Sequence, residues 1–300
     1  MELAWFFSFA AVFCCLEFLR PTAIRPSWRD RLANCVYLVL ALPIIFAILA
    51  CLGPVFTYAI QVSGGGLIAH FYTPSPTVLG GILTTVVYAV IWDIWHYWLH
   101  RWQHVSPFLW ETHKFHHSDA AINATTAGRQ HLLSYVFILL CHVPMLLVLG
   151  ALNPPAYACV LMFRVWGFVN HVNLRIGFGP FTSVIAGPQW HRIHHSVLPE
   201  HRSKNFATFF PFVDKLFGTY HAPATGEYPQ TGLLDEPLET FARQAGYAPL
   251  LVWYVRLRHF ITRGVRRVGE GAMKAPNRGQ EHVARKEDGL ARGAIVSAVD

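Results

Sequence analysis

Two histidine-rich stretches of the sequence have the residue types and the spacing of a metal site. Residues 93–118 read DIWHYWLHRWQHVSPFLWETHKFHHS, and residues 190–196 read WHRIHHS. In both stretches one histidine is followed three and four positions later by a histidine pair. The two triplets are His113, His116 and His117, and His191, His194 and His195. Positions i, i+3 and i+4 share one face of an α-helix, so each triplet presents several imidazoles on one side.

A third run of histidines, His96, His100 and His104, has the spacing i, i+4, i+8 and also forms a helical stripe. A single histidine on an apolar helix is usually a core residue, but three runs at ligand spacing favour metal binding. Imidazole suits zinc, copper, iron and nickel. One zinc ion takes about four protein ligands, so this many histidines predict two metal ions. The runs lack a nearby cysteine and an HExxH motif, which argues against zinc fingers and zincins.

The three runs resemble the histidine boxes of the fatty acid hydroxylase and sterol desaturase superfamily, which are integral-membrane, non-haem di-iron oxygenases. The boxes read HRWQH at 100–104, HKFHH at 113–117 and HRIHH at 191–195. NHVN at 170–173 resembles the family's extra histidine between boxes two and three. Residues 204–220 resemble its closing segment, with Val213 in place of a tryptophan and Phe206 where a tyrosine is common. The resemblance covers roughly residues 78–220.

The resemblance implies a set of metal ligands and no catalytic residue beyond the metal centre. The implied ligands are His100, His104, His113, His116, His117, His171, His191, His194 and His195. Further residues are possible ligands or supports of the ligands: His96, His131, Asp93, Asn173 and Asp214. Ligand and supporting roles are equally expected for His131, and a supporting role is favoured for His96. We expect Asp93 to accept a hydrogen bond from a metal-site histidine or its neighbour, because metal-bound histidines usually donate their other nitrogen.

The resemblance also implies an O2-dependent monooxygenase or desaturase that acts on a lipid. The implied cofactors are two iron ions, with zinc an expected substitute in purified protein, because imidazole binds both. Electrons would come from a separate donor of the cytochrome b5, ferredoxin or reductase type. Relatives process fatty acyl chains, sterol-like lipids, alkylglycerol ethers and carotenoids. The alternative is a haem-b or metal-transport membrane protein that uses the histidines without oxygenase chemistry.

The composition indicates an all-α integral membrane protein. Hydrophobic residues make up 53% of the 300 residues and charged residues only 14%, against about 25% in soluble domains. The net charge of +7 comes partly from arginines beside apolar runs, which favours contact with a membrane surface over nucleic acid. The six cysteines lie in apolar runs and are expected to be small core residues without disulfides. The N-terminal run lacks the basic start of a secretory signal and is interpreted as a retained span.

Five apolar runs approach the ~20 residues that cross a bilayer. They are residues 3–19, 35–62, 78–95, 132–149 and 156–172. Pro43 and Pro54 predict that the second run is kinked or broken in two. Four arginines between Arg20 and Arg31 predict that this loop is cytoplasmic, and the uncharged loop around Gly64–Gly66 is then outside. With five spans, all histidine boxes reach the cytoplasmic face.

The chain is therefore predicted to be a membrane helical bundle with a cytoplasmic, histidine-rich di-metal cap. The membrane would be the inner membrane of a bacterium or the endoplasmic reticulum of a eukaryote. Residues 206–220 are expected to cover the metal site. Four regions are predicted: transmembrane helices and a loop at 1–75, the catalytic domain at 76–222, an interfacial helical segment at 223–263 with a sixth span as the alternative, and a disordered basic tail at 264–300.

Overall fold

The computed structural model is mostly helical over the residues that it describes, which are 2–19, 21–22, 24–62, 77–149, 154–233, 241–247, 249–258 and 260. Over these residues no β-strand occurs, and β pairing is limited to two isolated bridges, Pro21 with Leu174 and Ser196 with Thr231. The chain forms two compact units, Met1–Pro249 and Leu250–Asp300. In the second unit, residues 250–258 are helical. The predicted disordered tail, 264–300, and the predicted outside loop, 64–66, lie outside the described residues.

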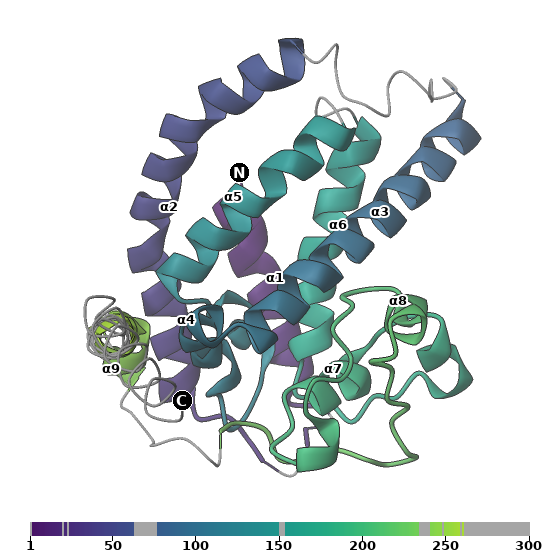
Figure 1. Ribbon diagram of the computed structural model, residues 1–300. Helices are drawn as coiled ribbons and strands as arrows, with labels where there is room; N and C mark the ends of the chain where they lie inside the picture. Colours follow the sequence, from purple (N-terminus) through teal and green to yellow (C-terminus); the bar gives the residue numbers. More distant parts are fainter. Residues whose placement is uncertain are drawn as a thin grey trace, which may run out of the picture. The chain divides into compact units, whose positions relative to one another are not determined.

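The first unit contains both long and short helices. The long helices are α1 (Glu2–Leu16), α2 (Trp28–Val62), α3 (Val78–Val105), α5 (Leu132–Leu149) and α6 (Pro154–His171). The short helices are α4 (Pro107–His117), η2 (Ala124–Gly128), η3 (Gly179–Ser183), α7 (Pro188–His194), η4 (Pro199–His201), α8 (Pro211–Leu216) and α9 (Phe241–Ala245). Figure 1 shows that α4 and α7 lie near the end at which α3 and α6 finish. The histidine boxes therefore gather at one end of the helices.

The helix α2 begins seven residues before the predicted span at Cys35, because a capping arrangement starts it. The Ser27 hydroxyl accepts the backbone N–H of Asp30 at 3.1 Å, and the Asp30 carboxylate accepts the N–H of Ser27 at 3.2 Å. These reciprocal bonds satisfy donors that a helix leaves unpaired at its start. Pro43 and Pro54 both lie inside this one helix, so of the two predicted alternatives, a kinked run or a broken one, the broken run is wrong. Figure 1 shows α2 curving along its length.

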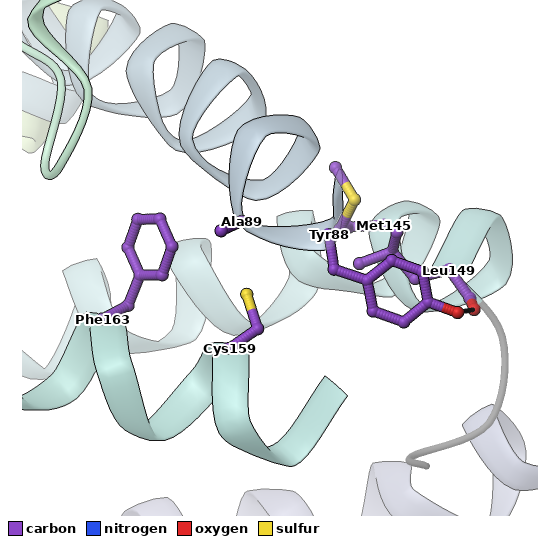
Figure 2. Close-up of a cluster of buried hydrophobic side chains, with 6 residues drawn as sticks. All are labelled: Tyr88, Ala89, Met145, Leu149, Cys159 and Phe163. Carbon is purple, nitrogen blue, oxygen red and sulfur yellow. Dashed lines mark hydrogen bonds between the residues drawn. The ribbon is translucent and has the colours of Figure 1, made fainter. Parts of the chain in front are cut away.

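An apolar cluster joins α3, α5 and α6 (Figure 2). Its buried members are Tyr88, Ala89, Met145, Leu149, Cys159 and Phe163. The Tyr88 hydroxyl donates to the carbonyl of Leu149 at 3.3 Å, so the polar end of this side chain is satisfied inside the cluster. Small side chains such as Ala89 and Cys159 let helices approach closely, which is how helices associate in lipid. This cluster fixes α3 and α6, the two helices that carry His100, His104 and His171.

Three helices of the described residues, α2, α3 and α5, are long and apolar enough to cross a bilayer. The start of α3 exposes large apolar side chains such as Val78 and Leu79, as expected for a surface that faces lipid. These features indicate an integral membrane protein. Two of the five predicted spans, now α1 and α6, are not among these three helices. α1 has only 15 residues, and α6 has 18 residues that include Arg164.

The six cysteines are unpaired, as predicted. Their predicted role as core residues holds for Cys159, which is buried. It is wrong for Cys15 and Cys51, which are exposed on apolar helices.

Candidate metal centre

Four helices place the predicted histidines at one end of the bundle. α3 continues beyond its apolar part and carries His100 and His104. Ser106 caps the next helix, α4, by accepting the N–H of Leu109 at 3.4 Å, and Pro107 occupies its first position, which suits a residue without an N–H. α4 carries the second box, α7 and the residue after it carry the third, and α6 ends at His171.

The nine histidines that the sequence predicts as ligands form two compact groups. In each group the candidate ligand nitrogens all lie within 4.8 Å of one another. The five-histidine group consists of His100, His104, His113, His117 and His194. The four-histidine group consists of His116, His171, His191 and His195. The groups are neighbours, because the rings of His117 and His195 stack with centroids 4.2 Å apart.

The nitrogens of the four-histidine group are spaced as ligands of one ion. The Nε2 atom of His171 lies 3.1 Å from the Nε2 atoms of both His116 and His191, and the latter lies 3.1 Å from that of His195. With metal–nitrogen bonds of about 2.1 Å, neighbouring ligands are about 3.0–3.4 Å apart. In the five-histidine group, the Nε2 atoms of His113 and His117 are 3.2 Å apart.

Backbone carbonyls fix the orientation of four of these rings. In each case the Nδ1 atom lies within hydrogen-bonding distance of a carbonyl oxygen, which leaves Nε2 as the free lone pair. The pairs are His100 with Phe206 at 2.9 Å, His116 with Arg129 at 3.2 Å, His171 with Gly167 at 2.6 Å, and His194 with Lys204 at 2.8 Å.

Burial keeps the box-two and box-three imidazoles neutral. Removal from water lowers the pKa of His194 to about 4. The same cause, with repulsion from neighbouring histidines, lowers the pKa well below the ordinary value for the others: His113, His116, His117, His191 and His195. At neutral pH these rings therefore keep a lone pair that can bind a cation.

These residues fit two metal ions better than they fit a protein core. In the five-histidine group the buried Nε2 atoms of His104 and His194 have no hydrogen-bond partner, and the Nε2 atoms of the four-histidine group lie against one another only. A buried polar atom without a partner costs about 1–3 kcal/mol, so a core would not collect several of them without compensation. A cation at the centre of each group would compensate for the converging nitrogens. A haem takes one or two axial ligands, which does not match groups of five and four.

Comparison with known protein families finds a match over the same region. Residues 85–219 match the model of the fatty acid hydroxylase family. This range contains all nine histidines of the two groups. We call residues 85–219 the hydroxylase domain, after the family whose model they match.

Relatives of the hydroxylase domain are lipid-modifying oxygenases by name. The chain is 32% identical over 131 residues to alkylglycerol monooxygenase of Homo sapiens, covering 43% of this chain and 29% of the relative. It is 27% identical over 155 residues to methylsterol monooxygenase 1-3 of Arabidopsis thaliana, covering 49% and 50%. It is 28% identical over 236 residues to a putative methylsterol monooxygenase of Dictyostelium discoideum, covering 73% and 80%. The chain thus spans about a third or less of the alkylglycerol monooxygenases. No solved structure matches.

Phe206, the first residue of the segment Phe206–Phe210, lies against the five-histidine group. The Phe206 ring is buried, and its centroid lies 5.5 Å from that of His100, 5.1 Å from His104 and 5.4 Å from His194. The expectation that residues 206–220 pack over the histidines is therefore confirmed for Phe206.

Asp93 and Asp214 hold this segment in place through five successive backbone N–H groups. Asp214 accepts the N–H groups of Phe206 and Ala207, both at 2.8 Å. Asp93 accepts those of the next three residues at 2.8, 3.1 and 2.6 Å. The expectation that Asp93 accepts from a histidine or its neighbour is wrong, because its carboxylate is occupied by the backbone. Asp93 is connected to His100 through the segment Phe206–Phe210, because it holds the backbone of that segment and the Phe206 carbonyl faces His100.

The remaining candidate residues lie outside both groups. His96 Nδ1 is 3.0 Å from the Thr208 hydroxyl, so His96 supports the segment Phe206–Phe210. His131 has both nitrogens engaged by backbone, Nε2 with the Gly246 carbonyl at 3.0 Å and Nδ1 with the N–H of Leu133 at 3.1 Å. A ligand role for His131 does not fit these contacts.

Asn173 connects the third box to the N-terminal part of the chain. Its side-chain oxygen accepts from Arg192 at 3.3 Å and also from the Thr22 hydroxyl. Its side-chain nitrogen donates to the carbonyl of Ile24 at 2.8 Å. Asn173 therefore positions elements and contacts no histidine through these bonds.

Two further residues, Glu17 and Arg129, support the site, and the role of Glu17 was missed from the sequence. Glu17 accepts the N–H groups of Ala124 at 2.7 Å and Asn173 at 2.9 Å, and it pairs with Arg31. Arg129 lies between the rings of Phe115 and Phe241, at 4.6 and 4.7 Å from their centroids. An acidic residue at the end of an apolar run was the available signal for Glu17, because a lone carboxylate there is costly unless it has partners.

Proposed function

We propose that this protein is an O2-dependent lipid hydroxylase with two iron ions bound by the nine histidines. The observation that carries the proposal is the division of nine buried histidines into groups of five and four inside the hydroxylase domain. Bound iron with O2 and two electrons supplies the oxidation that converts a C–H bond into an alcohol or, by loss of a second hydrogen, into an alkene. Zinc would occupy the same nitrogens in material prepared without iron.

Backbone carbonyls of the domain orient the ligands, and apolar side chains exclude water. The carbonyls of Phe206, Arg129, Gly167 and Lys204 face the Nδ1 atoms of their histidines, which aims Nε2 at the ion. Phe206, Ala207 and Val213 are almost completely buried beside Tyr97, so one side of the site is apolar and dry. A dry site prevents loss of oxidising equivalents to side reactions with water.

We propose a substrate that is a membrane lipid, with alkylglycerols and methylsterols as the first two classes to test. The relatives named for these substrates match the histidine-box region. The apolar helices α2, α3 and α5 would place the reactive carbon of such a lipid near the end of the bundle. We further propose that this end faces the cytoplasm, where a separate cytochrome b5, ferredoxin or reductase delivers the electrons.

Oxygen labelling tests this function. Purified protein in lipid nanodiscs would be incubated with ¹⁸O2, a reductant and either an alkylglycerol or a methylsterol, and the lipids analysed by mass spectrometry. A hydroxylase gives a product with one ¹⁸O atom, and a desaturase gives a product that lacks two hydrogens. A metal transporter or haem carrier gives neither product, and that result with both lipid classes and several reductants would contradict the proposal.

Single ligand substitutions connect the reaction to the two groups. His116→Ala and His194→Ala each remove one ligand from a different group, so turnover should fall below detection while the protein still inserts in the membrane. His142→Ala is the control, because this histidine is in neither group and hydrogen-bonds its own helix at Ile138. Retained turnover in either ligand variant would contradict the assignment.

A further inference from the structure

A third set of side chains with the chemistry of metal ligands lies apart from the nine histidines. His201, His221 and Glu227 each present a ligand atom, and these atoms lie within 4.8 Å of one another. Glu227 and His221 follow the matched range 85–219, so the hydroxylase domain does not account for this set. Two imidazoles and one carboxylate are a ligand set that zinc takes in proteins, with water at a fourth position.

The three side chains are held at this point by other residues. The Nδ1 atom of His201, which is buried, lies 2.9 Å from the Ser196 hydroxyl, so its Nε2 atom faces Glu227 at 3.2 Å. The second carboxylate oxygen of Glu227 accepts the N–H of Ala224 at 2.7 Å. A ligand whose other polar atom is already bonded keeps its orientation, and such partners are typical of metal sites.

Asn205 fixes the third ligand, His221, through its backbone. The Asn205 side-chain oxygen accepts the N–H of His221 at 2.8 Å, and its nitrogen donates to the carbonyl of His221 at 3.0 Å. Asn205 adopts a φ of 60°, a left-handed conformation that asparagine tolerates better than most residues. The ring of His221 thereby comes to 4.6 Å from that of His201.

We propose that His201, His221 and Glu227 bind one divalent transition-metal ion, best matched by zinc, that stabilises the segment after the third histidine box. The 3.2 Å between the His201 nitrogen and the Glu227 oxygen matches the ~3.0–3.4 Å between neighbouring zinc ligands. The half-exposed His221 and Glu227 leave the fourth position open to water. The ion would link residues 196–205 to residues 219–231, which already meet at the Ser196–Thr231 bridge. Residues 196–205 include Lys204, whose backbone carbonyl faces His194 of the third histidine box.

Metal counting tests the site in the full chain. Wild type, His221→Gln, Glu227→Gln and the control Glu200→Gln would be purified in detergent, loaded with Zn²⁺, washed and analysed for zinc per chain. Glu200→Gln makes the same charge change at an exposed position of the same loop, outside the three ligands. We expect His221→Gln and Glu227→Gln to hold one zinc fewer than wild type and Glu200→Gln. Both changed side chains are half-exposed, and gel filtration would confirm folding.

Removing a ligand from each of the two histidine groups distinguishes zinc bound at this site from zinc bound by those groups. The four proteins would be prepared again with His116→Ala and His194→Ala added, and the difference of one zinc should persist at a lower total. Equal zinc in all four proteins would overturn the proposal and leave His201 and Glu227 as a proton-bridged pair. A loss of zinc in Glu200→Gln equal to that in Glu227→Gln would also overturn it, because the loss would then reflect charge alone. The difference does not depend on hydroxylase activity.

Discussion

Asp93 and Asp214 hold the segment that lies against the five-histidine group. Together they accept five successive N–H groups of this segment. That segment supplies both the Phe206 ring over the histidines and the carbonyl that faces His100. Burial raises the pKa of Asp214, whereas the bonds from Thr219, Ala207 and Phe206 oppose the rise by stabilising the carboxylate.

Replacing either carboxylate by its amide should weaken the site without destroying it. In Asp93→Asn or Asp214→Asn, an NH2 group faces a backbone N–H, so the segment shifts and His100 loses its fixed orientation. Loss of such partners lowers metal affinity or activity about 10–100-fold. Iron content and turnover would be measured beside His100→Ala, which should be inactive, and Glu200→Gln, which should match wild type. Full iron and normal turnover in both amide variants would refute this role.

At the scale of elements, Glu17 joins the end of α1 to η2 and to the end of α6. It is buried, it accepts two backbone N–H groups, and it pairs with Arg31 of α2. One carboxylate thus connects four segments that are far apart in sequence. The N-terminal region contributes in this way to the position of His171.

Glu17→Ala should therefore reduce the stability of the first unit. The change leaves two N–H groups and the Arg31 guanidinium without their buried acceptor, which should cost about 3 kcal/mol. Denaturant unfolding in detergent would measure the loss, with the exposed Glu200→Ala as control. A difference below about 0.5 kcal/mol, the usual range of surface substitutions, would show that water replaces the carboxylate at no cost.

At the scale of the whole molecule, the orientation of the chain in the membrane stays a prediction. The arginines between Arg20 and Arg31 favour a cytoplasmic start of α2. A tag inserted at residues 64–66 should then be accessible from outside, and a tag after Gly264 should be accessible only after permeabilisation. Protease protection in intact and permeabilised cells would check both positions. Accessibility of both tags from one side would mean that the number of spans is not five.

The spacing of residues along the sequence predicted most of the histidine positions and the bounds of one helix. It could not predict contacts between segments that are far apart in the sequence. The i, i+3, i+4 pattern located six of the nine histidines, the i, i+4, i+8 stripe located His100 and His104, and the family resemblance supplied His171. Apolar length gave α5 with the same bounds as the structure. The partners of Asp93 lie more than 110 positions away, so no local pattern could show that it holds Phe210. The start of α2 at Trp28 could have been predicted from Ser27 and Asp30, because they have the spacing of a capping box. The triad of His201, His221 and Glu227 depends on two loops meeting in space.

Counting the metal ions held by the nine histidines tests the central claim most directly. The count would use the full chain carrying Glu227→Gln, which removes the third proposed site, purified from iron-supplied cells under reducing conditions and analysed for iron, zinc and haem. We predict two ions per chain, iron or iron with some zinc, and a lower count when His116→Ala or His194→Ala is added. One ion per chain, bound haem, or a count unchanged by both substitutions would contradict a two-metal centre.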